Sequence, residues 1–196
     1  MIFKVILSAI IGYLLGSIST GILIARLQGR DIRAEGSHNT GASNALRVLG
    51  LKSGLITFFG DFAKAALAVL IGKWLAGESG AMIGGLCAIL GHNWPVFFDF
   101  RGGKGIACSA AVLLLTCPWQ GAVAIAACLI VIAVSKYISL GSMTMLLVFF
   151  LLMLISKPFL PFTLWALFML VLGVYRHRSN IERLRNGTEN KIGHSV

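Results

Sequence analysis

The chain has 196 residues, of which 57% are hydrophobic and only 12% are charged, and its formal net charge is +10. A soluble domain is typically about half apolar and about a quarter charged, so this composition excludes an ordinary soluble protein and indicates one integral membrane helix bundle. In a membrane protein, a basic excess of this kind indicates the positive-inside rule, anionic lipid or an anionic substrate, and no nucleic-acid partner is expected.

Long apolar runs predict an all-α, polytopic membrane fold with seven transmembrane helices. A helix needs roughly 20 residues to cross the hydrocarbon core. The fourth run is short, so six spans with a re-entrant fourth segment is the alternative. In chain order, the seven runs lie near residues 2–25, 52–75, 80–98, 105–117, 119–135, 141–156 and 159–175.

Basic residues are distributed unevenly between the connections of these seven runs. Most of the 17 Lys and Arg residues lie after the first, third and fifth runs or in the C-terminal tail. The positive-inside rule therefore predicts an external N-terminus and a cytoplasmic tail. We expect a single domain over residues 1–196, in which residues 176–196 form an amphipathic tail.

A polar segment punctuated by glycine follows the first run. Glycine lets backbone N–H groups approach a ligand closely, and the side chains beside it add further donors. Arg47 lies one helical turn after Asn44, and its planar guanidinium suits a phosphate group. The segment therefore predicts an anion site, and a plain surface loop with helix caps is the alternative. Its candidate ligands are Ser37, Asn39, Thr40, Gly41, Ala42, Asn44 and Arg47.

A second glycine-rich segment follows the third run and leads into the fourth. A glycine loop that runs into a helix makes an anion site from backbone donors and the helix dipole. Lys104 adds a full positive charge to this site, although a tight turn with a snorkelling lysine is the alternative. Its candidate residues are Asn93, Gly102, Gly103 and Lys104.

Three ionisable residues of the second and third apolar runs are candidates for a task. Asp61 and Lys64 are three residues apart in the second run. A charged pair inside a membrane segment is a functional hypothesis by default, and a structural pair is the alternative. His92 ends the third run, where its pattern is equally compatible with a structural hydrogen bond and with catalysis.

The last part of the chain offers three further candidates. Ser142 follows Gly141 and either donates to an anion or caps a helix. His177 and Asn180 share one face of the expected tail helix, and docking of that helix on the bundle is the alternative reading.

Metal, redox and acyl-enzyme chemistry have no support in the sequence. The four cysteines form no C-x-x-C pair, and the acidic residues form no cluster. No Ser-His-Asp or Cys-His set is apparent, so we expect neither a metal nor another cofactor. A carrier for phosphate or an organic phosphate is the alternative function, although the polar residues gather at one face and carriers usually place their sites near the midplane.

Three separated segments carry a family resemblance: residues 36–44 with Arg47, residues 91–95 running on to 102–105, and Arg176-His177 with Asn180-Ile181 and residues 187–189. With these segments the chain resembles the PlsY family of bacterial acyl-phosphate:glycerol-3-phosphate acyltransferases. The His-x-x-x-x-Asp motif of other glycerophosphate acyltransferases is missing, since Ser43 follows His38 and Phe97 follows His92 at that spacing.

The resemblance implies a multi-pass protein of the bacterial inner (plasma) membrane with its active site on the cytoplasmic face. It implies transfer of a fatty acyl group from acyl phosphate to the 1-hydroxyl of sn-glycerol 3-phosphate, giving lysophosphatidic acid and phosphate in the first step of phospholipid synthesis. The expected partners are acyl phosphate, sn-glycerol 3-phosphate and membrane lipid. The oligomeric state and the acyl chain length stay open, and a monomer is compatible with the sequence.

With two phosphorylated substrates, the mechanism calls for a cationic site and a donor to the oxyanion. Direct transfer is expected because phosphate is already a good leaving group. The general base is either His177 or a substrate phosphate. The catalytic candidates are Asn44, Arg47, Lys104, His177 and Asn180, and the substrate-binding candidates are Ser37, Asn39, Thr40, Gly41, Ala42, Asn93, Gly102, Gly103 and Ser142.

Overall fold

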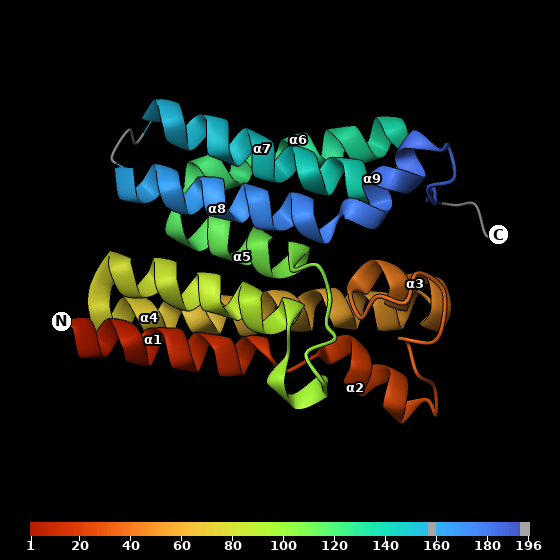
Figure 1. Cartoon of the computed structure of the whole chain (residues 1–196), viewed down its shortest axis with the longest axis horizontal. Coiled ribbons are helices and arrows are strands. Elements are labelled where there is room, and N and C mark those ends of the chain that lie inside the picture. Colours follow the sequence, from red (N-terminus) through yellow and green to blue (C-terminus); the bar gives the residue numbers. More distant parts are fainter. Residues whose placement is uncertain (157–159, 193–196) are drawn as a thin grey trace. The chain divides into compact units, whose positions relative to one another are not determined.

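The computed structural model of the chain describes residues 1–156 and 160–192, and every regular element in those residues is a helix (Figure 1). The all-α fold expected from the apolar runs is therefore confirmed. The contacts between residues divide the chain into two compact units, Met1–Thr116 and Cys117–Val196, and each is described by itself. A single functional domain over the whole chain stays a prediction, as do the number of membrane crossings and the side of the N-terminus.

The first apolar run is broken, where the sequence predicted one helix over residues 2–25. Three residues separate helix α1 (Ile2–Gly16) from helix α2 (Thr20–Leu27). The Ile18 carbonyl at the break accepts a hydrogen bond of 2.6 Å from the Lys64 ammonium. Because a backbone carbonyl released from a helix must find another partner, this contact stabilises a break that local propensity does not predict.

Helix α4 (Leu51–Asn93) is a helical hairpin. Ala76 and Gly77 have non-helical dihedral angles, and Gly77 has a φ of 62°, which favours glycine. As a straight helix, 43 residues would extend about 65 Å, twice the thickness of the hydrocarbon core. The two halves instead run back along each other, and a Cβ on Gly72 or Gly80 would overlap the other glycine's carbonyl oxygen. The break expected between the second and third runs is present, but the second helix ends at Asn93 and does not continue to residue 98.

Helices α1 and α5 (Ile106–Thr116) pack on α4, and α3 (Ala42–Leu49) lies against its first half (Figure 1). The contact with α1 is close because a Cβ on Gly12 would overlap the Gly84 carbonyl oxygen. Small residues let helix backbones approach in this way in membranes, where apolar burial gives no added drive. Helix α5 has 11 residues, about 16 Å, and is too short to cross the core by itself.

The second unit contains α6 (Pro118–Ser135), α7 (Ile138–Ser156), α8 (Leu160–Arg176) and α9 (Arg178–Arg185). Phe149 of α7 and Trp165 of α8 meet edge to face, with ring centroids 5.9 Å apart. Helix α9 matches the expected tail helix. The start of the seventh expected run, residue 159, and residues 193–196 of the expected tail lie outside the described residues.

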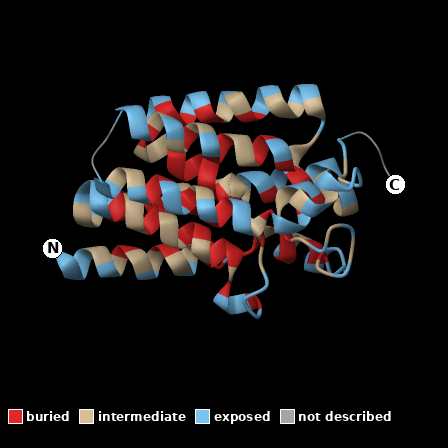
Figure 2. Cartoon of the chain, turned by 45° about the horizontal axis from the view of Figure 1, so that its top comes forward, coloured by how far each residue is buried: buried red, intermediate tan, exposed pale blue. Residues whose placement is uncertain are grey.

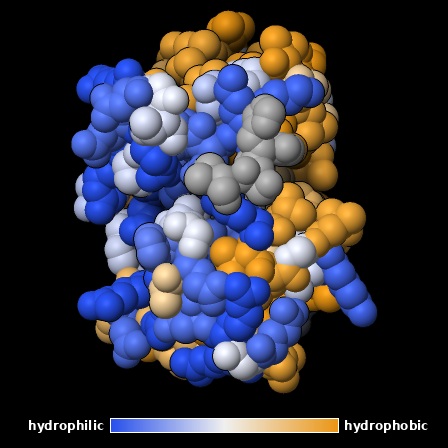
Figure 3. Space-filling view, turned by 90° about the vertical axis from the view of Figure 1, so that its right-hand side faces the viewer, coloured by the Kyte–Doolittle hydropathy of each residue, from blue (hydrophilic) through white to orange (hydrophobic). Residues whose placement is uncertain are grey.

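Helix length and composition fit a membrane protein. In the described part of the chain, four helical segments are long and apolar enough to cross a bilayer, and there are five if α8 and α9, which meet at a bend of 59°, count as one span. Exposed residues alternate with buried ones along the helix flanks, and many of the exposed residues are large and apolar (Figure 2). Hydrophilic side chains cover much of the side shown in Figure 3. An apolar exposed flank of this kind is suited to contact with lipid.

Candidate functional site

The first polar loop, between α2 and α3, is organised by the side chain of Asn44. Its amide nitrogen donates to the carbonyl oxygens of Ile32, Glu35 and Asn39 at 3.1, 3.0 and 2.9 Å. Its amide oxygen accepts the Ser37 N–H at 2.9 Å. The Asn44 side chain is buried with 1% exposure. An Asn amide has two N–H groups, so both are used to hold the loop.

Two neighbouring residues of this loop are shaped by the same contacts. Gly36 has a φ of 60°, and a Cβ there would overlap the Asn44 amide oxygen. The Asn39 side chain accepts the Gly41 N–H at 2.9 Å, forming an Asx turn that leads into α3 at Ala42. Thr40 is buried, and its hydroxyl has no hydrogen-bond partner among the described residues. The loop therefore has a defined backbone and a buried polar group available to a ligand.

Arg47 lies one helical turn after Asn44 but in the opposite environment. Its side chain is exposed and makes no hydrogen bond or ion pair with the part of the chain that the structure describes. The sequence predicted that Asn44 and Arg47 face one ligand. Asn44 instead points into the loop that it holds together, whereas Arg47 is free to meet an anion from solution.

Other cations of the loop are already paired. Arg30 forms an ion pair with Glu35 and donates to the Val48 carbonyl. Arg33 lies 3.2 Å from the Asp31 carboxylate, and its backbone N–H and then its guanidinium hold the pKa of Asp31 below its usual value. The carboxylates of Glu35 and Asp31 are therefore already paired with cations. They do not compete with an incoming anion for the Arg47 guanidinium.

The second polar loop folds back onto the end of α4. The Gly103 N–H donates to the His92 carbonyl at 3.0 Å. A Cβ on Gly102 would overlap that carbonyl oxygen, and a Cβ on Gly103 would overlap the His92 ring. Packing therefore explains the two glycines without a ligand. Asn93 is fully buried, and neither polar atom of its side chain has a hydrogen-bond partner among the described residues. Lys104 follows, half-buried.

The structure brings the two polar loops together within the first unit. Arg33 of the first loop reaches the carboxylate of Asp99 in the second at 3.5 Å. Arg26 lies over the ring of Phe98, which belongs to the short 3-10 helix η1 (Val96–Phe98), at 5.3 Å. A small apolar cluster lies beneath both loops, formed by Ile22, Ala25, Ile32, Ala45 and Phe98.

In the second unit, the candidate His177 stands at the junction of α8 and α9, buried with 2% exposure. Its Nδ1 atom lies 2.8 Å from the Gly173 carbonyl oxygen. A carbonyl only accepts, so Nδ1 carries the hydrogen and Nε2 is the atom that takes up or releases a proton.

Asn180 is held by Glu189, a residue that was absent from the predicted site. The Asn180 amide donates to the Glu189 carboxylate at 2.6 Å, and Arg183 donates to the same group at 2.7 Å. Ser139 of α7 donates to it at 2.9 Å. The only sequence signal for this network was the place of Glu189 within the third segment of the family resemblance.

Ser142 makes a bond within its own helix. Its hydroxyl donates to the Ile138 carbonyl at 2.8 Å, one turn back in α7, and the side chain is buried. The serine of this helix that reaches the Asn180 network is Ser139, one turn earlier. Substrate binding by Ser142 stays a prediction.

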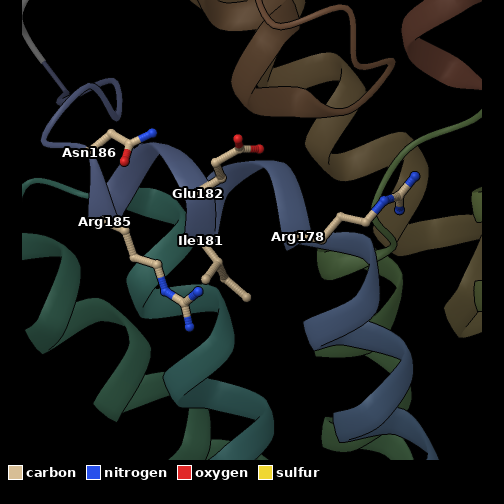
Figure 4. A pocket seen from close by; sticks show the side chains of 5 residues that line it. All are labelled: Arg178, Ile181, Glu182, Arg185 and Asn186. Carbon is tan, nitrogen blue, oxygen red and sulfur yellow. The ribbon is translucent and has the colours of Figure 1, made fainter.

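Helix α9 and its C-terminal end carry a surface pocket of about 520 Å³ (Figure 4). Ile181 and Arg185 point the same way from the helix, and Glu182 points away from them (Figure 4). None of the lining residues is a predicted site residue, and the pocket contains neither His177 nor Asn180. Its lining is Arg178, Ile181, Glu182, Arg185 and Asn186.

Comparison with known proteins gives one consistent family. The family model for glycerol-3-phosphate acyltransferase matches residues 6–187. The glycerol-3-phosphate acyltransferases of Thermoanaerobacter pseudethanolicus and Clostridioides difficile are 46% and 42% identical to this chain, covering 96% and 98% of it and 96% and 97% of their own lengths.

Two solved structures have the same fold. One is PlsY (YgiH), an integral membrane glycerol 3-phosphate acyltransferase, in its glycerol 3-phosphate form, with a TM-score of 0.91, 37% identity and coverage of 96% of both chains. The other is the lysophosphatidic acid form of that protein, with a TM-score of 0.88 and 37% identity over 96% of this chain and 95% of the other. The chain therefore belongs to the glycerol-3-phosphate acyltransferase family of integral membrane proteins.

Proposed function

We propose that this protein transfers a fatty acyl group from acyl phosphate to the 1-hydroxyl of sn-glycerol 3-phosphate, giving lysophosphatidic acid and inorganic phosphate. The observation that carries the proposal is the match over 96% of the chain to a solved relative whose two forms are the glycerol 3-phosphate and lysophosphatidic acid forms. Membership of this family favours an enzyme over a phosphate carrier. We place the reaction at the cytoplasmic face of the bacterial inner membrane, where the basic connections are expected.

Electrostatics explains why such a site needs cations. Two unit negative charges about 5 Å apart repel each other by about 3 kcal/mol at an effective dielectric constant of about 20. Arg47, Lys104 and a protonated His177 would offset this repulsion. Arg47 is the strongest of the three candidates, because its exposed guanidinium has no partner among the described residues and can bind a phosphate through two parallel hydrogen bonds.

In the proposed reaction, the 1-hydroxyl oxygen attacks the acyl carbonyl carbon and a tetrahedral oxyanion forms. The bond to the phosphate oxygen then breaks, and the electron pair leaves with inorganic phosphate. The hydroxyl proton goes either to Nε2 of His177 or to a substrate phosphate oxygen. An N–H donor of a glycine loop, or Asn180, would stabilise the oxyanion, a contribution worth about 10²–10³ in rate.

The remaining candidates would bind substrate phosphate. Ser37 and Thr40 would supply their hydroxyls and Ala42 its N–H in the first loop, and Gly41, whose own N–H is bonded to Asn39, would let the backbone approach the phosphate closely. Asn93, with two unpartnered buried polar atoms, supplies them beside the second. The four hydrogen bonds of Asn44 favour a positioning role for that residue. Asn39 acts in the same way through its Asx turn.

The donor is tested with purified protein in detergent. Labelled glycerol 3-phosphate is offered with acyl phosphate or with acyl-CoA of the same chain length, and lysophosphatidic acid and released phosphate are measured. We expect product only with acyl phosphate. Equal turnover of acyl-CoA would contradict the proposed donor. Liposome uptake of labelled glycerol 3-phosphate without any product would favour a carrier.

A further inference from the structure

The hairpin of α4 buries a cluster of ionisable side chains that the proposed chemistry does not use. Asp61 and Lys64 lie in its first half and His92 ends its second half. Their exposures are 1%, 8% and 4%. Ionisable groups at such positions in a membrane protein are costly to bury and are kept where they have a task.

Lys64 is the centre of this cluster. Its ammonium nitrogen lies 2.8 Å from the Asp61 carboxylate, 3.0 Å from His92 Nδ1, and within hydrogen-bond distance of the Ile18 carbonyl. An ammonium has three N–H groups and no acceptor, so Lys64 donates to the Ile18 carbonyl and to His92 Nδ1, which leaves the ring hydrogen on Nε2. The Asp61 carboxylate is the ion-pair partner of Lys64 and also lies 3.5 Å from His92 Nδ1. Both charged side chains therefore face the same edge of the ring.

The other edge of the His92 ring supports the second polar loop. A Cβ on Gly103 would overlap His92 Nε2, which places the ring directly against that residue. The His92 carbonyl accepts the Gly103 N–H at 3.0 Å. The cluster also reaches the start of α5, because the Cys108 thiol donates to the Asp61 carbonyl at 3.2 Å. The charged cluster and the turn that precedes Lys104 are therefore in contact through one imidazole.

We propose that Asp61, Lys64 and His92 are positioning residues that fix the turn of residues 102–104, and with it Lys104, in the arrangement that binds the phosphate of the acceptor substrate. Lys64 and Asp61 set the tautomer and orientation of His92, and the ring of His92 supports the turn. The inference rests on the proposed function, because it assigns the turn to a phosphorylated substrate.

A merely structural role explains the cluster less well. Well-packed apolar residues can replace a buried ion pair without loss of stability. They cannot donate a hydrogen bond to Nδ1, so they cannot fix which nitrogen of the imidazole carries the hydrogen. An apolar pair would keep the hairpin closed and leave the ring free to turn.

This difference defines the experiment. The double variant Asp61→Leu/Lys64→Met removes both charges together, so no unpaired charge stays buried. We expect the variant to stay folded in detergent, with a melting temperature somewhat below that of the wild type because the Ile18 carbonyl loses its hydrogen bond from Lys64. We expect KM for glycerol 3-phosphate to rise by about tenfold or more and kcat to change by less than about threefold, since binding that is equal in the ground and transition states appears in KM. An unchanged KM in the folded double variant would overturn the proposal.

A second comparison decides the matter if the double variant does not fold. His92→Gln can place an amide N–H near the position of Nε2, whereas His92→Phe keeps the ring volume without a donor. We expect KM of the Gln variant to lie closer to the wild-type value. Equal KM values for the two variants would contradict positioning through Nε2.

The proposed function and the positioning role are tested by different measurements. Wild-type protein that makes no product from acyl phosphate and glycerol 3-phosphate refutes that function. Calorimetric titration of glycerol 3-phosphate into the wild type and into Asp61→Leu/Lys64→Met then tests the inference alone. We expect the dissociation constant to rise by about tenfold, as for KM, and equal constants would overturn the inference.

Discussion

Residues one helical turn apart can have opposite tasks, as Asn44 and Arg47 do. Asn44 is buried, and its amide forms hydrogen bonds with the loop backbone. Arg47 is exposed and has no protein partner in the described chain. Spacing along a helix placed both residues near the same loop. It did not distinguish the side chain that builds the loop from the one that is free to bind, because that depends on which carbonyl groups fold back over α3.

We expect Arg47→Ala to lower kcat/KM by about 10- to 100-fold, since a hydrogen bond to a charged group is worth about 1.5–3 kcal/mol. Arg47→Lys should recover only part of this loss, because lysine keeps the charge but not the planar fork. The measurement is steady-state turnover in detergent. Arg185→Ala, on helix α9, is the matched control. Equal losses in the two alanine variants would count against a specific role.

We expect Asn44→Ala to lower the free energy of unfolding by about 1–3 kcal/mol, because buried carbonyl and N–H groups of the loop lose their partner. The effect is measured as a fall in melting temperature. Ser43→Ala changes the exposed neighbour on the same helix and should stay within about 0.5 kcal/mol of the wild type. A melting temperature for Asn44→Ala equal to that of the control would show that the loop does not depend on this amide.

At the scale of elements, glycine acts by allowing close approach of two backbones. The two halves of α4 meet at Gly72 and Gly80, and α1 meets the second half at Gly12 and Gly84. In the second unit the corresponding element is the network around Glu189, which joins α7, α9 and the segment that follows α9. The glycine contacts hold helices together, and the Glu189 network holds the segment after α9 against two helices.

We expect Gly72→Leu to destabilise the hairpin, because a side chain there overlaps the Gly80 carbonyl and overpacking costs about 1–3 kcal/mol. The melting temperature in detergent measures this. Leu70→Ile, at an exposed position of the same helix half, should leave it nearly unchanged. Equal melting temperatures would mean that the halves do not pack through this contact.

We expect Glu189→Ala to lower kcat/KM by about tenfold or more, because Asn180 and Arg183 lose a charged acceptor worth about 1.5–3 kcal/mol per hydrogen bond. Glu182→Ala removes an exposed carboxylate from the other face of α9 and serves as the control. Turnover and melting temperature are measured together. A Glu189→Ala enzyme with wild-type kinetics would exclude a contribution of this network to the site.

At the scale of the whole molecule, the expected topology has an external N-terminus and a cytoplasmic tail. Single cysteines introduced at Glu78 and Gly187 test it with a membrane-impermeant maleimide. We expect Glu78→Cys to be labelled in intact spheroplasts, and Gly187→Cys to be labelled only in inside-out vesicles. The reverse pattern would invert the topology and move the polar loops to the outer face.

The membrane class, the all-α fold, the family and the order of the polar segments could be predicted from the amino-acid sequence, because apolar runs, glycine punctuation and short motifs are properties of neighbouring residues. The packed helices were needed to reveal the break at Ile18, the pairing of Lys64 with His92, the loop-building role of Asn44 and the contact of Ser139, not Ser142, with Glu189. Each of these includes a contact with a residue nine or more positions away in the chain. The spacing of residues along the chain does not indicate which buried donor will contact which carbonyl or carboxylate group. Those contacts form only when helices from distant parts of the sequence pack together.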